Sequence, residues 1–148
     1  MPEIQPVNLH KLLSSIYLLM LPSLEQKGIK LEVRCAHPDV MAQIDRNLIE
    51  QVVINFITNA TNAVKDKPEP HIILFSGITE EHPYLTVADN GCGISPGIHE
   101  KMFIPFFSTK KNGTGIGLSL SREIVKMHHG RLQVQSKEGE GSAFTILF

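Results

Sequence analysis

Residues 46–65 constrain the fold most, because apolar side chains recur around most of a predicted helix in this segment. Asp45 precedes the segment and is a suitable N-cap residue. The polar positions that remain form one narrow strip, which consists of Gln51, Asn55, Asn59 and Asn62. The pattern therefore predicts a long helix that is buried except along this strip.

The spacing of apolar residues predicts the other elements. Two further helices are expected, one that Asn8 caps and Gly28 closes, and one over 116–127 that ends at Gly130. Strands are expected at 29–35, at 41–44 pairing with 29–35, at 72–78 and 84–88 as a hairpin, and at 132–136 and 143–148. Residues 89–115 are expected to form a long functional loop with a short helix near 98–103.

This order of elements favours an α+β fold over a doubly wound sheet. The predicted architecture is a two-layer sandwich, in which three helices cover a mixed, mostly antiparallel sheet of about five strands. A chain of 148 residues with 42% hydrophobic content is long enough for one domain with a proper core, so residues 1–148 are expected to form a single domain.

Composition argues against several classes of function. The formal net charge of −1 gives no general basic field for nucleic acid or anionic lipid. The apolar run 16–21 is far shorter than the roughly 20 residues of a membrane span, and no export signal follows Met1. Cys35 and Cys92 lack the spacing of a zinc site, which fits reduced thiols. A cytoplasmic location without membrane contact by this chain is expected.

Asn55 and Asn59 are one helical turn apart, so both amides project from the same face of the predicted helix. Magnesium prefers oxygen ligands and retains waters and substrate phosphates, so a neutral amide oxygen can supply one ligand while a nucleotide supplies the charge. An isolated pair of this kind more often faces water or bonds to neighbouring backbone. Its meaning depends on the motifs that follow.

Asp89 ends a predicted strand and precedes Gly91 and Gly93, which allow the backbone to turn tightly against a ligand. A carboxylate at this position would accept a hydrogen bond from the amino group of adenine, whereas guanine offers an oxygen there. The carboxylate would therefore select ATP over GTP. Taken alone, the same string is a common turn.

Gly113, Gly115 and Gly117 open a predicted helix, whose unpaired N–H groups could hold a phosphate. Their spacing matches neither a P-loop nor a dinucleotide-binding motif. A glycine hinge is the alternative interpretation. Lys110 and Lys111 precede the loop and could neutralise phosphate charge, or they could be ordinary solvated lysines.

In order and spacing, these segments resemble the ATP-binding catalytic domain of bacterial sensor histidine kinases, within the GHKL ATPase superfamily. The matching boxes are 51–60, 89–94, 103–110 and 113–118. The resemblance implies that Asn59 ligates Mg²⁺, that Asp89 binds adenine, and that 103–112 is a mobile lid. It also places phosphates on Gly113, Gly115 and Gly117, and it adds Gly91, Gly93, Ile94, Thr114 and Leu118 to the pocket.

Two positions carry the predicted chemistry, Asn55 and Lys110. Hydrolytic members of the superfamily have a glutamate where this chain has Asn55, and an amide cannot activate water. This difference favours phosphoryl transfer to a positioned acceptor. Many members also carry a basic residue where this chain has Asn62. Neutralisation of the phosphate charge would therefore depend on Lys110 or Lys111.

The resemblance implies that the phosphoacceptor histidine lies elsewhere. No helix before Asp45 offers it, and His99 falls in the loop before the third box. We therefore expect a catalytic fragment that works with the dimerisation domain of its parent protein and with a response regulator. The alternatives are an anti-sigma-type serine kinase, against which Asn55 argues, and a nucleotide sensor without transfer activity.

Overall fold

The computed structural model describes residues 1–104 and 117–148. The helices are α1 (Leu9–Gln26), α2 (Arg46–Val64), α3 (Pro96–Lys101) and α4 (Gly117–Met127). The strands are β1 (Gln5–Asn8), β2 (Lys30–Cys35), β3 (Met41–Ile44), β4 (His71–Thr79), β5 (His82–Asp89), β6 (Arg131–Lys137) and β7 (Gly141–Leu147). Among these described residues, no helix has both the length and the apolar character needed to cross a bilayer.

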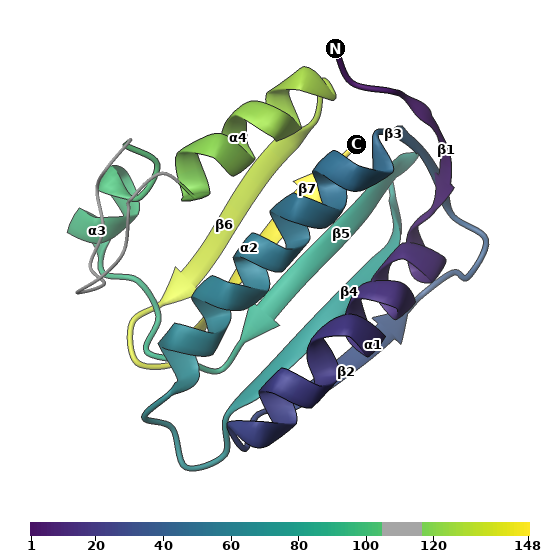
Figure 1. Ribbon diagram of the computed structural model, residues 1–148. Coiled ribbons are helices and arrows are strands. Elements are labelled where there is room, and N and C mark those ends of the chain that lie inside the picture. Colours follow the sequence, from purple (N-terminus) through teal and green to yellow (C-terminus); the bar gives the residue numbers. More distant parts are fainter. Residues whose placement is uncertain (105–116) are drawn as a thin grey trace.

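The main sheet has five strands in the order β2-β4-β5-β7-β6 (Figure 1). The β2–β4 pair is parallel, and the β4–β5, β5–β7 and β6–β7 pairs are antiparallel. A mixed, mostly antiparallel sheet is therefore confirmed. Register across the β5–β7 pair places Asp89 opposite Ser142, so the end of β5 lies beside the start of β7.

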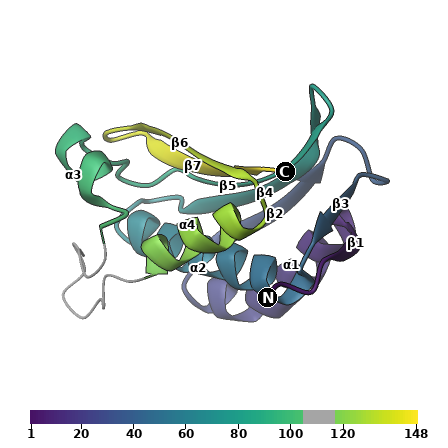
Figure 2. The ribbon, with the colours of Figure 1, turned by 90° about the horizontal axis from the view of Figure 1, so that it is seen from above.

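The long helices α1, α2 and α4 lie on the same side of the five-stranded sheet, which gives two layers (Figure 2). The core fills the space between the layers, because apolar residues alternate on the strands and recur along the helices. Its largest fully buried side chains are Leu9, Leu12, Leu13, Ile16, Leu24, Ile44, Ile49, Ile57, Ile72, Leu74, Leu85 and Ile146. Three helices covering one sheet is the architecture that the sequence predicted.

The C-terminal ends of α1 and α4 are closed by residues in the left-handed backbone conformation. Gly28 ends α1 with a φ of 70°, and the next N–H donates to Leu24 O at 2.9 Å. At the end of α4, Gly130 N–H donates to Val125 O at 3.1 Å, but the left-handed residue is His129, with a φ of 58°. Gly130 therefore takes part in closing α4, as the sequence predicted, whereas the left-handed conformation itself falls on His129.

Asp45 joins three parts of the chain. Its Oδ1 accepts the Leu48 N–H at 3.1 Å as the cap of α2, and its Oδ2 accepts the Glu3 N–H at 2.9 Å. These two N–H groups, Glu3 first, hold the pKa of the Asp45 carboxyl below its ordinary value. The Asp45 N–H donates to His128 Nε2 at 3.0 Å, and His128 Nδ1 lies 2.7 Å from Ile124 O. The tautomer of His128 that fits both contacts carries its proton on Nδ1.

The predicted pairing of 41–44 with 29–35 was wrong. β3 pairs instead with β1 in an antiparallel two-stranded sheet, while β2 pairs with β4. No strand was predicted at 5–8, because the segment is short and contains Pro6, which lacks an N–H but is tolerated on an edge strand. Leu9 N–H extends the same contact by donating to Val40 O at 3.0 Å.

Candidate functional site

Asn55, Asn59 and Ala63 follow one another at four-residue intervals on α2, so they lie on one side of the helix, here called the asparagine face. The other sides of α2 are fixed in the core, where Val53 and Ile57 are fully buried. All three members of the asparagine face are half-buried. The other predicted site segments that the structure describes meet this face.

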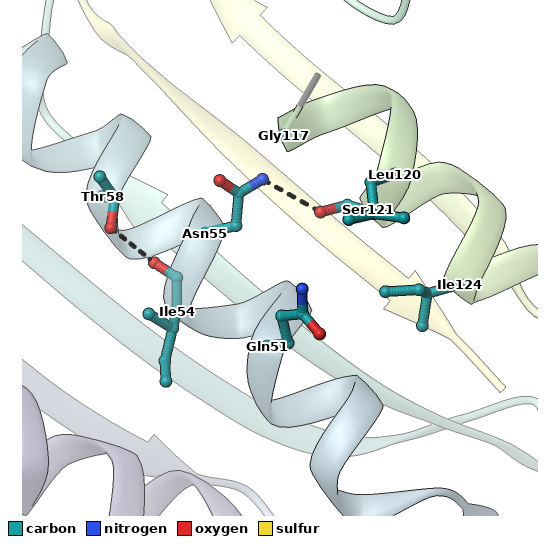
Figure 3. Close-up of a pocket in the computed structure, with 8 residues that line it drawn as sticks. All are labelled: Gln51, Ile54, Asn55, Thr58, Gly117, Leu120, Ser121 and Ile124. Atoms are coloured by element: carbon teal, nitrogen blue, oxygen red, sulfur yellow. Dashed lines mark hydrogen bonds between the residues drawn. The ribbon is translucent and has the colours of Figure 1, made fainter. Parts of the chain in front are cut away.

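The start of α4 packs against Asn55 at one end of the asparagine face. A Cβ atom at Gly117 would lie 2.7 Å from Asn55 Oδ1 and 3.0 Å from Asn55 Nδ2, so only glycine allows this approach. One turn further along α4, Ser121 Oγ accepts a hydrogen bond from Asn55 Nδ2 at 3.0 Å (Figure 3). Gly117 and Ser121 therefore hold the Asn55 amide between them.

A cleft of about 240 Å³ lies along this contact between α2 and α4. Its lining combines polar and apolar side chains from both helices (Figure 3). The lining residues are Gln51, Ile54, Asn55, Thr58, Gly117, Leu120, Ser121 and Ile124. Asn55 and the Ser121 hydroxyl that it bonds to thus both line this cleft.

The loop after β5 packs against Ala63 at the other end of the asparagine face. Cys92 N–H donates to Ala63 O at 3.1 Å. A Cβ atom at Gly91 would lie 2.6 Å from the same oxygen and 2.8 Å from Ala63 Cβ, so a side chain there would push the loop off the helix. Asn59 lies on α2 between this contact and the contact of Asn55 with Gly117.

Asp89 ends β5 at the base of this loop. Burial raises the pKa of its carboxyl above the ordinary value, although hydrogen bonds from the N–H groups of Gly91 and Ser142 oppose the shift. Gly91 N–H lies 2.8 Å from Asp89 Oδ1. The carboxylate is therefore poorly hydrated, held by backbone, and retains acceptor capacity for a ligand.

The turn between β6 and β7 fixes the shape of this loop. Gly93 and Gly141 have φ values of 71° and 134°, and a Cβ atom at either would overlap a backbone carbonyl oxygen, that of Lys137 or of Asp89. Gly139 N–H also donates to the Cys92 carbonyl oxygen at 2.6 Å. The end of β5 and the loop after it are held by backbone contacts.

Residues 44–148 match the sequence model of the family described as "Histidine kinase-, DNA gyrase B-, and HSP90-like ATPase". This match covers well over half of the chain. The chain belongs to this ATPase family. The boxes that suggested the resemblance to sensor histidine kinase catalytic domains lie inside the matched region, and the resemblance is confirmed.

Two relatives of this chain are named as a sensor kinase and a sensor protein. The chain is 38% identical over 103 residues to the signal transduction histidine-protein kinase AtoS of Escherichia coli, covering 70% of this chain and 17% of that protein. It is 33% identical over 147 residues to the C4-dicarboxylate transport sensor protein DctS of Rhodobacter capsulatus, covering 98% of this chain and 22% of that protein. The chain therefore spans about a fifth of the length of these relatives.

Among solved structures, the catalytic domain of the histidine kinase ThkA superposes with a TM-score of 0.88 at 29% identity, covering 99% of this chain and 95% of that chain. ThkA in complex with the response regulator protein TrrA superposes with a TM-score of 0.83 at 26% identity, covering 98% of this chain and 41% of that chain. The predicted fold of the ATPase family is confirmed by these matches.

Three residues of the glycine boxes have roles in the fold. Asn90 Oδ1 accepts the His71 N–H at 2.8 Å and Asn90 Nδ2 donates to Glu69 O at 2.8 Å, so this side chain anchors the start of β4. The predicted pocket residues Ile94 and Leu118 are half-buried and pack against the core. Ile94 N–H donates to Ser136 Oγ at 2.7 Å.

Several predicted site residues lie outside the described residues. They are Lys110, Gly113, Thr114 and Gly115, with the alternative cation Lys111. Most of the predicted lid segment also falls there. Asn62, where the resemblance led us to expect a basic residue in many members, donates from Nδ2 to Thr58 O at 3.0 Å along its own helix.

Sequence reasoning missed two serines. Ser142 follows the last glycine turn and donates its N–H to the Asp89 carboxylate, but only strand register reveals this pairing. Ser121 bonds to the Asn55 amide from α4. Its position four residues after Gly117, on the same side of the helix, was the available signal.

Proposed function

We propose that this chain binds Mg-ATP and transfers its γ-phosphoryl group to a histidine on a separate dimerisation domain, as the catalytic part of a two-component sensor kinase. One observation supports this most. The start of α4 and the loop after β5 meet opposite ends of the asparagine face, with Asn59 between them. A single ligand along this face would contact all three segments.

Asp89 is proposed to bind adenine. Its carboxyl keeps acceptor capacity after accepting the Gly91 N–H, and its partial burial makes an unpaired acceptor costly. A purine with an amino donor would form a hydrogen bond with this carboxylate, whereas guanine would place an acceptor oxygen against it. Gly91 and Gly93, with Ile94 beside them, would form the wall of this subsite.

The phosphates and Mg²⁺ are proposed to lie at the α4 end of the asparagine face. The side chains there fit such a group, because Asn55 and Asn59 offer amide oxygens and Gly117 brings no side chain. Asn59 would ligate the cation. Mg²⁺ would supply neutralisation of phosphate charge during transfer. Gly113, Thr114, Gly115, Leu118 and Lys110 would complete the phosphate subsite, as the family resemblance implies.

Asn55 favours transfer over hydrolysis. A neutral amide cannot take a proton from water, so this residue would orient the reacting groups without activating a nucleophile. In the proposed reaction, a neutral imidazole nitrogen of the acceptor attacks the γ-phosphorus, a P–N bond forms, and the P–O bond to ADP breaks. ADP keeps that oxygen, and the ring proton passes to solvent. Catalysis then rests on positioning and charge neutralisation.

The partners would be the dimerisation domain of the parent protein and a response regulator. The complex of ThkA with TrrA supports the second partner, because its kinase shares this fold at 26% identity. The location would be cytoplasmic. No nucleic acid or membrane contact by this chain is part of the proposal.

A labelling experiment tests the proposal. The chain would be mixed with radiolabelled ATP, Mg²⁺ and the isolated dimerisation hairpin of its parent. We expect acid-labile, base-stable label on the hairpin, the signature of phosphohistidine. An acid-stable label would indicate a serine kinase, and ATP binding without any label would indicate a nucleotide sensor. Either result would contradict the proposed reaction.

A further inference from the structure

The Asn55 side chain has two ends of opposite character. Its carbonyl oxygen accepts hydrogen bonds or ligates cations, and its NH₂ group only donates. We propose that Ser121 is a positioning residue that fixes the orientation of the Asn55 amide, so that Oδ1 faces the bound cation. This inference rests on the function proposed above and concerns the same site.

The geometry gives the amide a direction. Asn55 Nδ2 donates to Ser121 Oγ at 3.0 Å, one turn into α4. A Cβ atom at Gly117 would lie closer to Asn55 Oδ1, at 2.7 Å, than to Nδ2, at 3.0 Å. Nδ2 therefore points to the second turn of α4, where Ser121 lies (Figure 3), and Oδ1 is the terminal atom nearer to the Cβ position of Gly117.

Burial makes Ser121 effective in this role. Ser121 is only 3% exposed, so water replaces its hydroxyl poorly as a partner for Asn55. Thr58 lines the same cleft, but its hydroxyl bonds to Ile54 O at 3.0 Å on its own helix. Gly117 leaves room for the amide in this orientation, because a Cβ atom there would lie 2.7 Å from Asn55 Oδ1.

The reversed orientation would oppose the proposed ligand. It would turn the Asn55 NH₂ group toward the first N–H groups of α4 and toward a cation, where donor would face donor. With the observed orientation, Oδ1 can accept from cation-bound water or ligate the cation directly. Ser121 thus selects the orientation that the cation requires.

Removing the hydroxyl tests the proposal. In Ser121→Ala, both amide orientations become accessible, so the affinity for ATP in the presence of Mg²⁺ should fall about three- to tenfold, the fold-change that loss of one hydrogen bond gives. Calorimetric titration with ATP and EDTA should give an unchanged Kd. Thr58→Ala is the matched control, because it removes a hydroxyl from the same cleft that does not contact Asn55, and its Mg²⁺ dependence should match the wild type.

A second background isolates orientation from packing. In Asn55→Asp both terminal atoms are oxygens, so no reversed orientation exists. Adding Ser121→Ala to this variant should leave its Mg²⁺ dependence unchanged. An equal loss in both backgrounds would show that Ser121 acts through packing and would overturn the proposal.

A spectroscopic readout needs no nucleotide. In the wild-type protein, the Asn55 side-chain amide should give two separate ¹H–¹⁵N NMR signals, with one proton shifted and protected by the bond to Ser121. In Ser121→Ala this protection should disappear while the backbone spectrum stays the same. Wild-type-like protection would contradict the inference. If Asn59→Ala and Asp89→Asn also left ATP binding unchanged, the proposed function itself would fail.

Discussion

The two ends of the asparagine face are built differently. At the Asp89 end, backbone N–H groups, a strand register and glycine contacts hold the carboxylate in place. At the Asn55 end, one side-chain hydrogen bond between two helices sets the geometry. The geometry of the Asp89 end is set by strand pairing within the sheet, whereas that of the Asn55 end depends on how α4 packs against α2. Substitutions at the first end should therefore affect folding and base binding, and those at the second should affect the response to Mg²⁺.

The largest effect is expected from Gly141→Ala. An alanine would need a φ of 134° and its Cβ would overlap the Asp89 carbonyl oxygen, so unfolding free energy should fall by about 2–4 kcal/mol. Gly139→Ala is the control, because its φ is 85° but its Cβ would meet nothing within 4 Å, and it should cost about 1 kcal/mol. Urea denaturation would measure both variants. Equal losses of unfolding free energy would show that backbone strain, and not the contact with the Asp89 carbonyl oxygen, determines the effect at this turn.

Asp89→Asn should have the next largest effect, on ATP affinity. Loss of a hydrogen bond to a charged group costs about 1.5–3 kcal/mol, or about ten- to a hundredfold in Kd. Calorimetric titration would measure it, with GTP as the comparison ligand. An unchanged Kd for ATP would remove the adenine assignment.

Asn59→Ala should weaken ATP binding by about 1.5 kcal/mol, roughly tenfold, only when Mg²⁺ is present. The reason is that the amide oxygen would ligate the cation and not the nucleotide. Titrations with Mg²⁺ and with EDTA separate the two cases. Equal losses under both conditions would indicate a folding defect.

His129→Gly should stabilise the protein by about 0.5–1 kcal/mol, because glycine relieves the left-handed strain but adds entropy to the unfolded chain. His129 has a φ of 58° and an exposed side chain at the end of α4. Thermal unfolding would measure the gain. ATP affinity should stay the same, and a change in it would mean that the end of α4 reaches the Asn55 end of the site.

The smallest expected effect is on the pH dependence of folding. Because burial raises the folded-state pKa of Asp89, the folded protein binds this proton more tightly than the unfolded chain does. Stability from this group should therefore decrease as pH rises from about 3.9, the ordinary Asp pKa, through the raised folded-state pKa. The nucleotide-free Asp89→Asn variant should lack this decrease. A wild type that gained stability relative to the variant over this range would contradict the shift.

Sequence periodicity predicted most of the fold, since α2 and the hairpin of β4 and β5 have strong apolar patterns. It failed where pairing partners are not local, as for β3, which pairs with a strand that contains Pro6. The site was predicted from residue order, but individual roles required contacts. Gly117 was assigned to phosphate, and the structure gives it a packing reason as well, because a side chain there would strike Asn55. Ser142 and Ser121 became visible only through strand register and helix packing.

The hydrogen bonds of Asp45 have a mechanical consequence. Its carboxylate holds the first turn of α2 and the backbone of Glu3, while its N–H holds the ring of His128 at the end of α4. The helices α2 and α4 are thus both linked through Asp45 to the backbone at Glu3. A force applied to the chain at Glu3 would be transmitted to both helices through these hydrogen bonds, and not through the five-stranded sheet.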